Sequence, residues 1–438
     1  MNIILAFLEL IMLKQLILEN WKSFRYAELP LDPLTVLIGT NASGKSNVVE
    51  ALEFLQRIAR GENIEAALAG DKTLTSIRGG VEWAAIKPET EFTLKALVQG
   101  EDDKTDYFYS ITLQTIPVVR ILKECINIDE DHNKDSRNQK LFIINVDDKT
   151  AKSHLSNYGG FSVDISDLFE DFSFQEFHEV IKEETKQKMR YEIKQKMEFA
   201  QNNLDYLINY VILPIIKNIL ILNPIPSKMR DYSRLSDTLE GDASNIAGVL
   251  AGLTEEQKTE VELTLSEYIK DFPEGDIQRV WAEKVGRFGT DAMLYCQEEW
   301  KPGHITEIDA RTMSDGTLRF LAILTALLTR PEGSQLVIEE IDNGLHPSRA
   351  ELLVKILREI GSKRKIDILL TTHNPALLDA LGPEIVPFVV VAHRDKETGE
   401  SKLTLLEDIE NLPILLASGT LGRLATKGAI EKSLSDNK

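Results

Sequence analysis

The stretch Leu34–Asn47, LTVLIGTNASGKSN, decides the fold. An apolar run typical of a short buried strand ends at Gly39, and from Gly44 to about Arg60 apolar residues recur at helical spacing. The residues between fit the pattern Gly-x4-Gly-Lys-Ser, which requires a strand before it and a helix after it. Such a loop points successive backbone N–H groups into one concavity at a helix N-terminus, where anions bind. We therefore predict a phosphate-binding loop; a plain glycine turn is the alternative.

This loop carries the side chains that nucleotide chemistry requires. Lys45 would reach the β- and γ-phosphates, and the Ser46 hydroxyl would bind Mg²⁺. ATP and Mg²⁺ are therefore the predicted ligands. The residues predicted to bind the nucleotide are Gly39, Asn41, Ala42, Ser43, Gly44, Lys45, Ser46 and Asn47.

A second apolar strand, Gln335–Ile338, is followed by two acids, Glu339 and Glu340. In phosphoryl-transfer sites one carboxylate orients Mg²⁺ and a second polarises the attacking water. Adjacent side chains on a strand point in opposite directions, so both roles require the strand to end here. Alone this pattern is weak, because many strands end in acids.

Two further features lie at element ends. Ser314 and Gly316, in MSDGT, open an apolar helix, and a helix N-terminus can bind an anion. His373 follows an apolar strand ending in TT, and α/β sheets bind ligands at the carboxyl ends of strands. The plainer interpretations are a helix N-cap for Ser314 and a structural histidine for His373.

Taken in order, these motifs resemble the ATP-binding heads of ABC-class ATPases, in the RecF/SMC/OLD-like branch often called AAA-family ATPases. The resemblance implies an α/β P-loop NTPase fold, in which a mixed or parallel sheet with helices is split by a mainly helical insertion. Softer matches are NPIPSKMR and GDASNIAGVLAGL, and the insertion matches in type more than in sequence. The firm matches are LENWKSF (Leu18–Phe24), GTNASGKSN (Gly39–Asn47), MSDGTLRFLAI (Met313–Ile323), LVIEEIDNGLHP (Leu336–Pro347) and TTHNPALLDAL (Thr371–Leu381).

The resemblance also implies roles for single residues. Glu339 would be the Walker B acid and metal ligand, with Ser46, and Glu340 the catalytic base. His373 would be the switch histidine, and Lys45 would act in catalysis with both. Ser314 and Gly316 would form the signature that contacts the γ-phosphate of ATP on a partner protomer.

The match has departures. The signature reads SDGT instead of SGGQ, and Glu339 replaces an aspartate. Asp342–His346 would lie where the family has its D-loop. The glutamine of the Q-loop stays open between Gln99 and Gln114.

The predicted organisation is one ATPase head divided along the chain. Residues 1–11 are an apolar leader that we predict not to be native, with Met12 as the start. Residues 12–165 form the N-terminal part of the head, and residues 166–275 a helical lid or short coiled-coil pair. Residues 276–438 complete the head with the signature, the Walker B acids and His373.

The charge excludes a protein that is basic overall. The chain of 438 residues has 50 Lys and Arg against 70 Asp and Glu, a net charge of −20. Any contact with DNA would therefore be local. Lys186, Arg190 and Lys194 could form such a basic helix face, although interleaved glutamates favour a merely solvated one. Two cysteines without a CxxC pair argue against structural zinc and a disulfide framework and lead us to expect a cytoplasmic protein. No segment is long and apolar enough to span a bilayer, so no membrane contact is expected.

These inferences lead to three alternative functions. The leading one is an ATP-hydrolysing homodimeric switch, in which head-to-tail signatures close two ATPs. Stand-alone ATPases of this branch resemble the ATPase subunits of anti-phage systems such as Septu and PARIS, which work with a separately encoded effector, often a nuclease. No DxD carboxylate set follows His373, so a fused Toprim nuclease is not expected. The alternatives are a RecF-like DNA repair ATPase and a scaffold that binds nucleotide without hydrolysing it.

Overall fold

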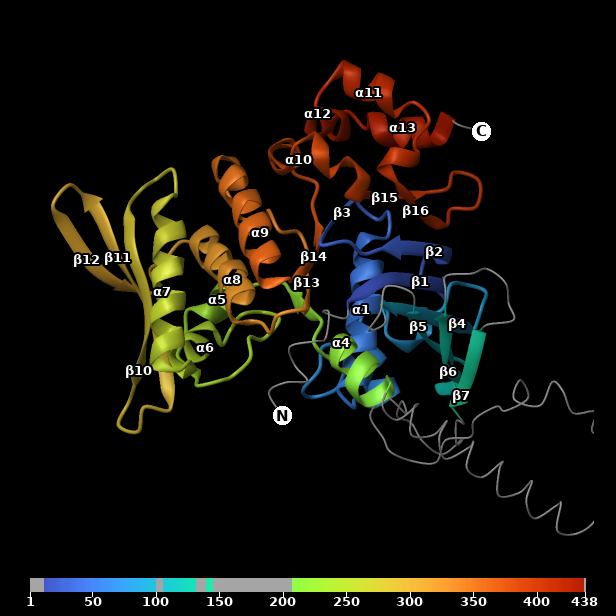
Figure 1. Cartoon of the computed structure of the whole chain (residues 1–438), viewed down its shortest axis with the longest axis horizontal. Helices are drawn as coiled ribbons and strands as arrows, with labels where there is room; N and C mark the ends of the chain where they lie inside the picture. The colour runs from blue at the N-terminus through green and yellow to red at the C-terminus, as the bar shows by residue number, and fades with distance from the viewer. Residues whose placement is uncertain (1–11, 100–104, 131–138, 145–206, 437–438) are drawn as a thin grey trace, which may run out of the picture. The chain divides into compact units, whose positions relative to one another are not determined.

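The computed structural model describes residues 12–99, 105–130, 139–144 and 207–436 (Figure 1). These residues belong to two compact units. The first consists of Met1–Pro30 and Glu50–Asn218, and the second of Leu31–Val49 and Ile219–Lys438. The predicted leader, residues 166–206 of the predicted insertion and its basic face lie outside the described residues. The predicted boundaries at residues 165 and 275 stay predictions.

An antiparallel sheet forms the first unit, with strands in the order β7-β6-β5-β4-β1-β2. On β4 every second residue from Phe92 to Val98 is buried, as expected when one face of a sheet covers a core. The rings of Trp21, Phe54 and Phe92 pack there with centroids 4.9 to 6.2 Å apart. The strands are β1 (Leu13–Trp21), β2 (Phe24–Pro30), β4 (Glu91–Gln99), β5 (Thr105–Gln114), β6 (Arg120–Glu130) and β7 (Gln139–Ile144).

Helix α1 (Lys45–Ala59) starts in the second unit and continues into the first. Its observed bounds lie within one residue of the predicted helix, because the apolar spacing and the glycine before Lys45 both define it. The first unit also contains α2 (Ile64–Ala69), the 3-10 helix η2 (Val81–Trp83), the π-helix η6 (Leu207–Ile212) and α4 (Leu213–Lys217).

The second unit has a mainly parallel sheet, in the order β16-β15-β3-β14-β13-β8. All neighbours from β15 to β8 are parallel, and β16 alone pairs antiparallel. Every residue of β13 and β14 is buried, as is typical of parallel strands covered on both faces. The strands are β3 (Leu34–Ile38), β8 (Leu220–Leu222), β13 (Gln335–Ile338), β14 (Asp367–Thr371), β15 (Val389–Arg394) and β16 (Ser401–Leu405).

A smaller antiparallel sheet, β10-β11-β12 with β9 beside β11, also belongs to the second unit (Figure 1). Helix α7 (Glu255–Lys270) packs on it, and Ser266 Oγ accepts a hydrogen bond from the N–H of Val280 at 3.0 Å. Helix α7 thus covers this sheet. These strands are β9 (Ser233–Arg234), β10 (Ile277–Val285), β11 (Asp291–Lys301) and β12 (His304–Asp309).

The remaining helices of the second unit fall into two groups. Helix α8 (Asp315–Thr329), which begins at the predicted signature, contacts four of them. These are α5 (Pro226–Met229), α6 (Ile246–Gly252), α7 (Glu255–Lys270) and α9 (Ala350–Arg364). The C-terminal helices are α10 (Pro375–Leu381), α11 (Leu412–Ser418), α12 (Leu421–Thr426) and α13 (Ala429–Asp436). In the part of the chain that the structure describes, no helix is both long and apolar enough to cross a membrane.

Candidate nucleotide-binding site

The loop between β3 and α1 has the backbone shape that a phosphate loop needs. Gly39, Ala42 and Gly44 have φ angles of 144°, 62° and 113°. A Cβ at Gly39 would lie 2.1 Å from the carbonyl oxygen of Ala392, so only glycine fits at that position. Ser43 is buried, and its hydroxyl has no hydrogen-bond partner within the described residues. A bound phosphate would satisfy this buried hydroxyl, so the loop fits a nucleotide.

Lys45 lies over this loop and faces carboxylates. Its Nζ donates hydrogen bonds to the carbonyl oxygens of Gly39 at 2.7 Å and Thr40 at 3.0 Å. Burial lowers the pKa of Lys45, while the negative charges of Glu340, Glu339 and Glu431 raise it. The site therefore contains a partly desolvated ammonium group whose charge is favoured by several nearby carboxylates. This arrangement is favourable for a bound metal and phosphates.

The two predicted acids follow directly after the end of β13. The N–H of Glu339 donates to the carbonyl oxygen of Leu222 at 3.3 Å, and the N–H of Glu340 donates to Thr371 Oγ1 at 2.8 Å. Glu340 has a φ of 47°, in the left-handed region that most residues avoid. This turn ends the alternation of side-chain directions along β13. The carboxylates of Glu339 and Glu340 therefore need not point to opposite faces of the sheet. An unusual backbone conformation at a strand end is typical of functional sites.

The register of the parallel strands explains why distant motifs meet. Leu37 pairs with Thr371, and Ile338 pairs with Leu370. The segments that follow β3, β14 and β13 therefore leave the sheet at one edge, side by side. These segments carry the phosphate loop, His373 and the two acids, respectively.

At the end of β14, the polar residues hold the neighbouring loop in place. Thr372 is fully buried, and its Oγ1 donates to Asp342 Oδ1 at 2.5 Å and accepts from the N–H of Asn374 at 3.0 Å. Asn374 Oδ1 in turn accepts from the N–H of Ala376 and caps α10. His373 lies between them with its side chain exposed at the sheet edge.

Thr372→Val should lower the free energy of unfolding by about 1–3 kcal/mol, because it keeps the shape but removes a buried hydroxyl bonded to a charged group. Chemical denaturation measures this change. Thr329→Val is the matched control, since the Thr329 hydroxyl only donates to a carbonyl of its own helix. Equal effects of the two substitutions would contradict the role assigned to the Thr372 hydroxyl.

Ser314 and Gly316 lie at the start of α8. Ser314 Oγ accepts a hydrogen bond from the N–H of Thr317 at 3.1 Å, so Ser314 is an N-cap, as the plainer interpretation required. Its side chain is also exposed, which leaves it accessible to another molecule. A Cβ at Gly316 would lie 2.8 Å from the carbonyl oxygen of Gly344, so the start of α8 packs tightly against the loop after Glu340.

The metal ligands and the Q-loop glutamine are the remaining predicted residues of the site. Ser46 and Glu339 supply a hydroxyl and a carboxylate oxygen, and Mg²⁺ prefers such oxygen ligands and retains several waters. This donor set fits Mg²⁺. Gln99 and Gln114 lie on β4 and β5 of the first unit, and the Q-loop glutamine stays open between them.

Two further residues near the site were not predicted from the sequence. Arg394 Nε donates a hydrogen bond to the carbonyl oxygen of Ala42 at 2.8 Å, and Glu431 acts electrostatically on Lys45. Arg394 ends the apolar run VVVAHR, so the strand-end rule that selected His373 could have found it. No local pattern points to Glu431, because it belongs to a short amphipathic helix.

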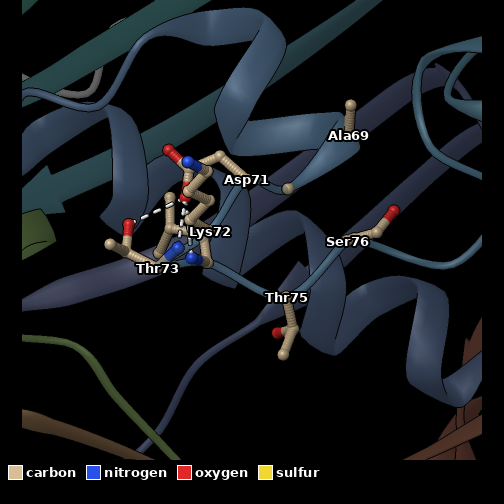
Figure 2. Close-up of a pocket in the computed structure, with 8 residues that line it drawn as sticks. Ala69, Asp71, Lys72, Thr73, Thr75 and Ser76 are labelled. Carbon is tan, nitrogen blue, oxygen red and sulfur yellow. Dashed lines mark hydrogen bonds between the residues drawn. The ribbon is translucent and has the colours of Figure 1, made fainter.

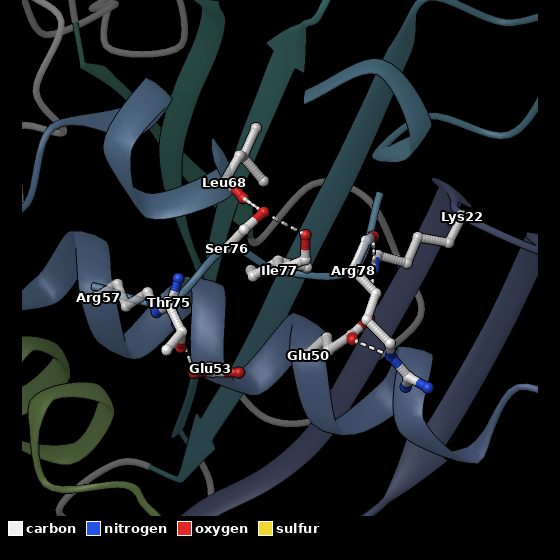
Figure 3. A network of polar contacts seen from close by, with 9 residues as sticks. All are labelled: Lys22, Glu50, Glu53, Arg57, Leu68, Thr75, Ser76, Ile77 and Arg78. Atoms are coloured by element: carbon white, nitrogen blue, oxygen red, sulfur yellow. Dashed lines mark hydrogen bonds and ion pairs between the residues drawn. The ribbon is translucent and has the colours of Figure 1, made fainter. Parts of the chain in front are cut away.

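Two other polar regions belong to the first unit. The surface hollow in Figure 2 is formed by one loop, in which Asp71 accepts hydrogen bonds from the N–H groups of Thr73 and Leu74. The Asp71 carboxylate thus holds the shape of its own loop. Figure 3 shows an ion network in which Glu50 contacts Lys22 and Arg78.

Fold and loop together define a P-loop ATPase head. Residues 34–379 match the family described as "AAA domain, putative AbiEii toxin, Type IV TA system". This match covers most of the chain, and the chain therefore belongs to that family. No curated protein matches the sequence.

Solved structures of SMC heads are similar in fold. An SMC head bound to the C-terminal winged-helix domain of ScpA has 12% identity and a TM-score of 0.50, covering 90% of this chain and 97% of that one. An SMC head with an extended coiled coil, bound to the C-terminal domain of ScpA and derived from Pyrococcus furiosus, has 15% identity and a TM-score of 0.46. This second match covers 93% of this chain and 99% of that one. The family match and the first of these structures confirm the predicted fold class, a P-loop ATPase head with a mixed sheet.

Proposed function

We propose that this protein is an ATP-hydrolysing switch that dimerises when it binds ATP and regulates a separately encoded effector, a nuclease in anti-phage defence. One observation carries the ATPase part. The phosphate loop with Lys45 follows β3, the carboxylates Glu339 and Glu340 follow β13 on the other side of β14, and these carboxylates interact electrostatically with Lys45.

The residues then have distinct roles in the reaction. The loop N–H groups and Lys45 would bind the triphosphate, and Ser46 and Glu339 would hold Mg²⁺. Bound Mg²⁺ neutralises charge on the β- and γ-phosphates. Glu340 would accept a hydrogen bond from the attacking water and take its proton, while His373 would contact the γ-phosphate.

The dimer part rests on the signature. Ser314 is exposed at the N-terminus of α8, a helix of 15 residues whose dipole favours an anion at this end. In the resembled family this segment contacts the ATP of a partner protomer. An SMC head of similar fold has been solved with a bound ScpA domain, which supports a protein partner for a head of this kind.

Lys45→Ala should reduce ATP turnover by about 10²- to 10³-fold, because it removes the cation that stabilises the developing phosphate charge.

Glu340→Gln should also lose turnover, by about 10²- to 10⁴-fold, but keep ATP bound and so accumulate a dimer. Light scattering with saturating ATP and Mg²⁺ measures the dimer. Glu332→Gln, an exposed acid before β13, is the control and should behave as wild type. A Glu340→Gln protein that remains monomeric contradicts the dimer switch, and a wild type without turnover supports the scaffold alternative.

The effector is tested separately. Purification of the native protein from its own cells should yield a second protein with nuclease activity. If instead DNA increases the ATPase rate and no partner co-purifies, the RecF-like alternative replaces this part of the proposal.

A further inference from the structure

The hairpin formed by β15 and β16 lies directly beside the phosphate loop. Strand β15 pairs in parallel with β3, with Val391 opposite Ile38. It therefore continues past the end of β3 alongside the loop. The carbonyl oxygen of Ala392 is the atom that excludes any side chain at Gly39. The hairpin is thus one wall of the loop.

The turn of this hairpin is held firmly by Asp395. Its carboxylate accepts hydrogen bonds from the N–H groups of Glu397 at 2.9 Å and Thr398 at 3.0 Å, and from Lys402 Nζ at 2.7 Å. These bonds hold the pKa of Asp395 well below its usual range, with Lys402 as the largest cause. The N–H of Gly399 also donates to the carbonyl oxygen of Asp395 at 2.9 Å. The position of Gly399 is therefore well defined.

Arg394 joins this turn to the phosphate loop. Its Nη1 donates to the carbonyl oxygen of Gly399 at 2.7 Å, and its Nε donates to that of Ala42 at 2.8 Å. Ala42 is the residue of the loop that adopts a left-handed conformation without being glycine, with a φ of 62°. A conformation of this kind persists when the surroundings hold it, and the bond from Arg394 does so.

The guanidinium also has capacity for a ligand. A guanidinium has five N–H donors. The contacts to Ala42 and Gly399 use two of them, the others have no partner among the described residues, and the side chain is exposed. Its positive charge lies beside Ala42 of the phosphate loop. The other cation of this loop, Lys45, interacts electrostatically with three carboxylates.

We propose that Arg394 is a positioning residue of the nucleotide site, which holds the Ala42 peptide in its binding conformation and adds positive charge for the phosphates of a nucleoside triphosphate. This inference rests on the proposed ATPase function and deepens it. It differs from a purely structural role, in which the arginine would brace the hairpin turn and the nucleotide would not sense its loss.

The test compares Arg394→Ala, Arg394→Lys and the control Lys396→Ala, each in the full chain. Lys396 is exposed in the same turn, so its removal takes one positive charge from the hairpin without a contact to the loop. Titration calorimetry with ATP and Mg²⁺ gives Kd, and steady-state assays give KM and kcat. Arg394→Ala should raise Kd and KM by about tenfold to a hundredfold, the effect of one hydrogen bond to a charged group, with kcat changed less than about threefold.

Arg394→Lys should bind ATP with intermediate affinity, since it keeps the charge but cannot reach both carbonyls as a fork. Lys396→Ala should bind as wild type. Wild-type affinity in Arg394→Ala overturns the inference, and so does a fall in kcat and melting temperature with KM unchanged. If Arg394→Ala does not fold, Arg394→Lys is the deciding variant. Wild-type ATP affinity in Arg394→Lys would then overturn the inference that both guanidinium hydrogen bonds support nucleotide binding. A wild type that binds no ATP is a different result, since it removes the proposed function itself.

Discussion

Gly39→Ala should weaken ATP binding by more than about a hundredfold while leaving the fold intact. The new Cβ would lie 2.1 Å from the carbonyl oxygen of Ala392 and 2.8 Å from Ser43 Oγ. The first of these is a backbone atom within the sheet, so the loop has to move instead. A misplacement of about 1 Å in a site can cost on the order of a hundredfold in rate, and we expect a loss of ATP affinity at least as large when the loop moves. Calorimetric titration with ATP, together with a circular dichroism spectrum, checks both parts.

Gly303→Ala is the matched control for this prediction. Gly303 has a φ of 79°, and a Cβ there would have nothing within 4 Å. The substitution therefore introduces backbone strain of about 1 kcal/mol without a collision. It should lower stability slightly and leave ATP affinity unchanged. Equal losses of affinity in both variants would show that the contact with Ala392 is not what makes Gly39 necessary.

Glu50→Ala should lower the free energy of unfolding of the first unit by about 3–5 kcal/mol. Glu50 accepts hydrogen bonds from Lys22 Nζ and, at 2.6 Å, from Arg78 Nε (Figure 3). The side chain of Lys22 is only 6% exposed and that of Glu50 only 10%. Burial already lowers the pKa of Lys22, and Glu50 opposes that shift. Without the carboxylate, the chain would bury an uncompensated ammonium. Urea denaturation followed by circular dichroism measures the loss.

Two comparisons make this prediction specific. Glu89→Ala breaks the ion pair with Arg25, whose partners are 42% and 44% exposed, and should cost at most about 1 kcal/mol. The double variant Lys22→Met with Glu50→Ala should recover part of the loss, because no buried charge remains.

In Glu50→Ala alone, Lys22 binds its proton less tightly in the folded state than in the unfolded state. The stability of this variant should therefore rise as the pH approaches 10.5, the ordinary pKa of lysine. A stability that does not depend on pH in this range would argue against the buried ammonium.

Much of the site could be predicted because it is encoded in local patterns. Strand Gln335–Ile338 has the predicted bounds, and α1 differs from its prediction by about one residue at each end. Apolar runs, helical spacing and glycines act over a few residues, so they are readable without the rest of the chain. The positions of His373 and of the two acids at strand ends follow from the same patterns.

Other features depend on contacts between residues far apart in the sequence. The smaller sheet under α7 was not predicted from the sequence, because the pairing of its strands depends on contacts between separate segments of the chain. Glu340 adopts its left-handed turn with its N–H bonded to Thr371, a residue on another strand. Arg394 acquires its contact with Ala42 only because β15 lies next to β3 in the sheet.

The sequence by itself determined that a phosphate loop lies between a strand and a helix, and that acids and a histidine end two later strands. Only the tertiary structure decided that Leu31–Val49 joins the residues after Ile219 in one unit, and which further side chains reach the loop. The physical reason is the order of parallel strands, which is set by packing and backbone hydrogen bonds over the whole sheet and therefore leaves no local signal.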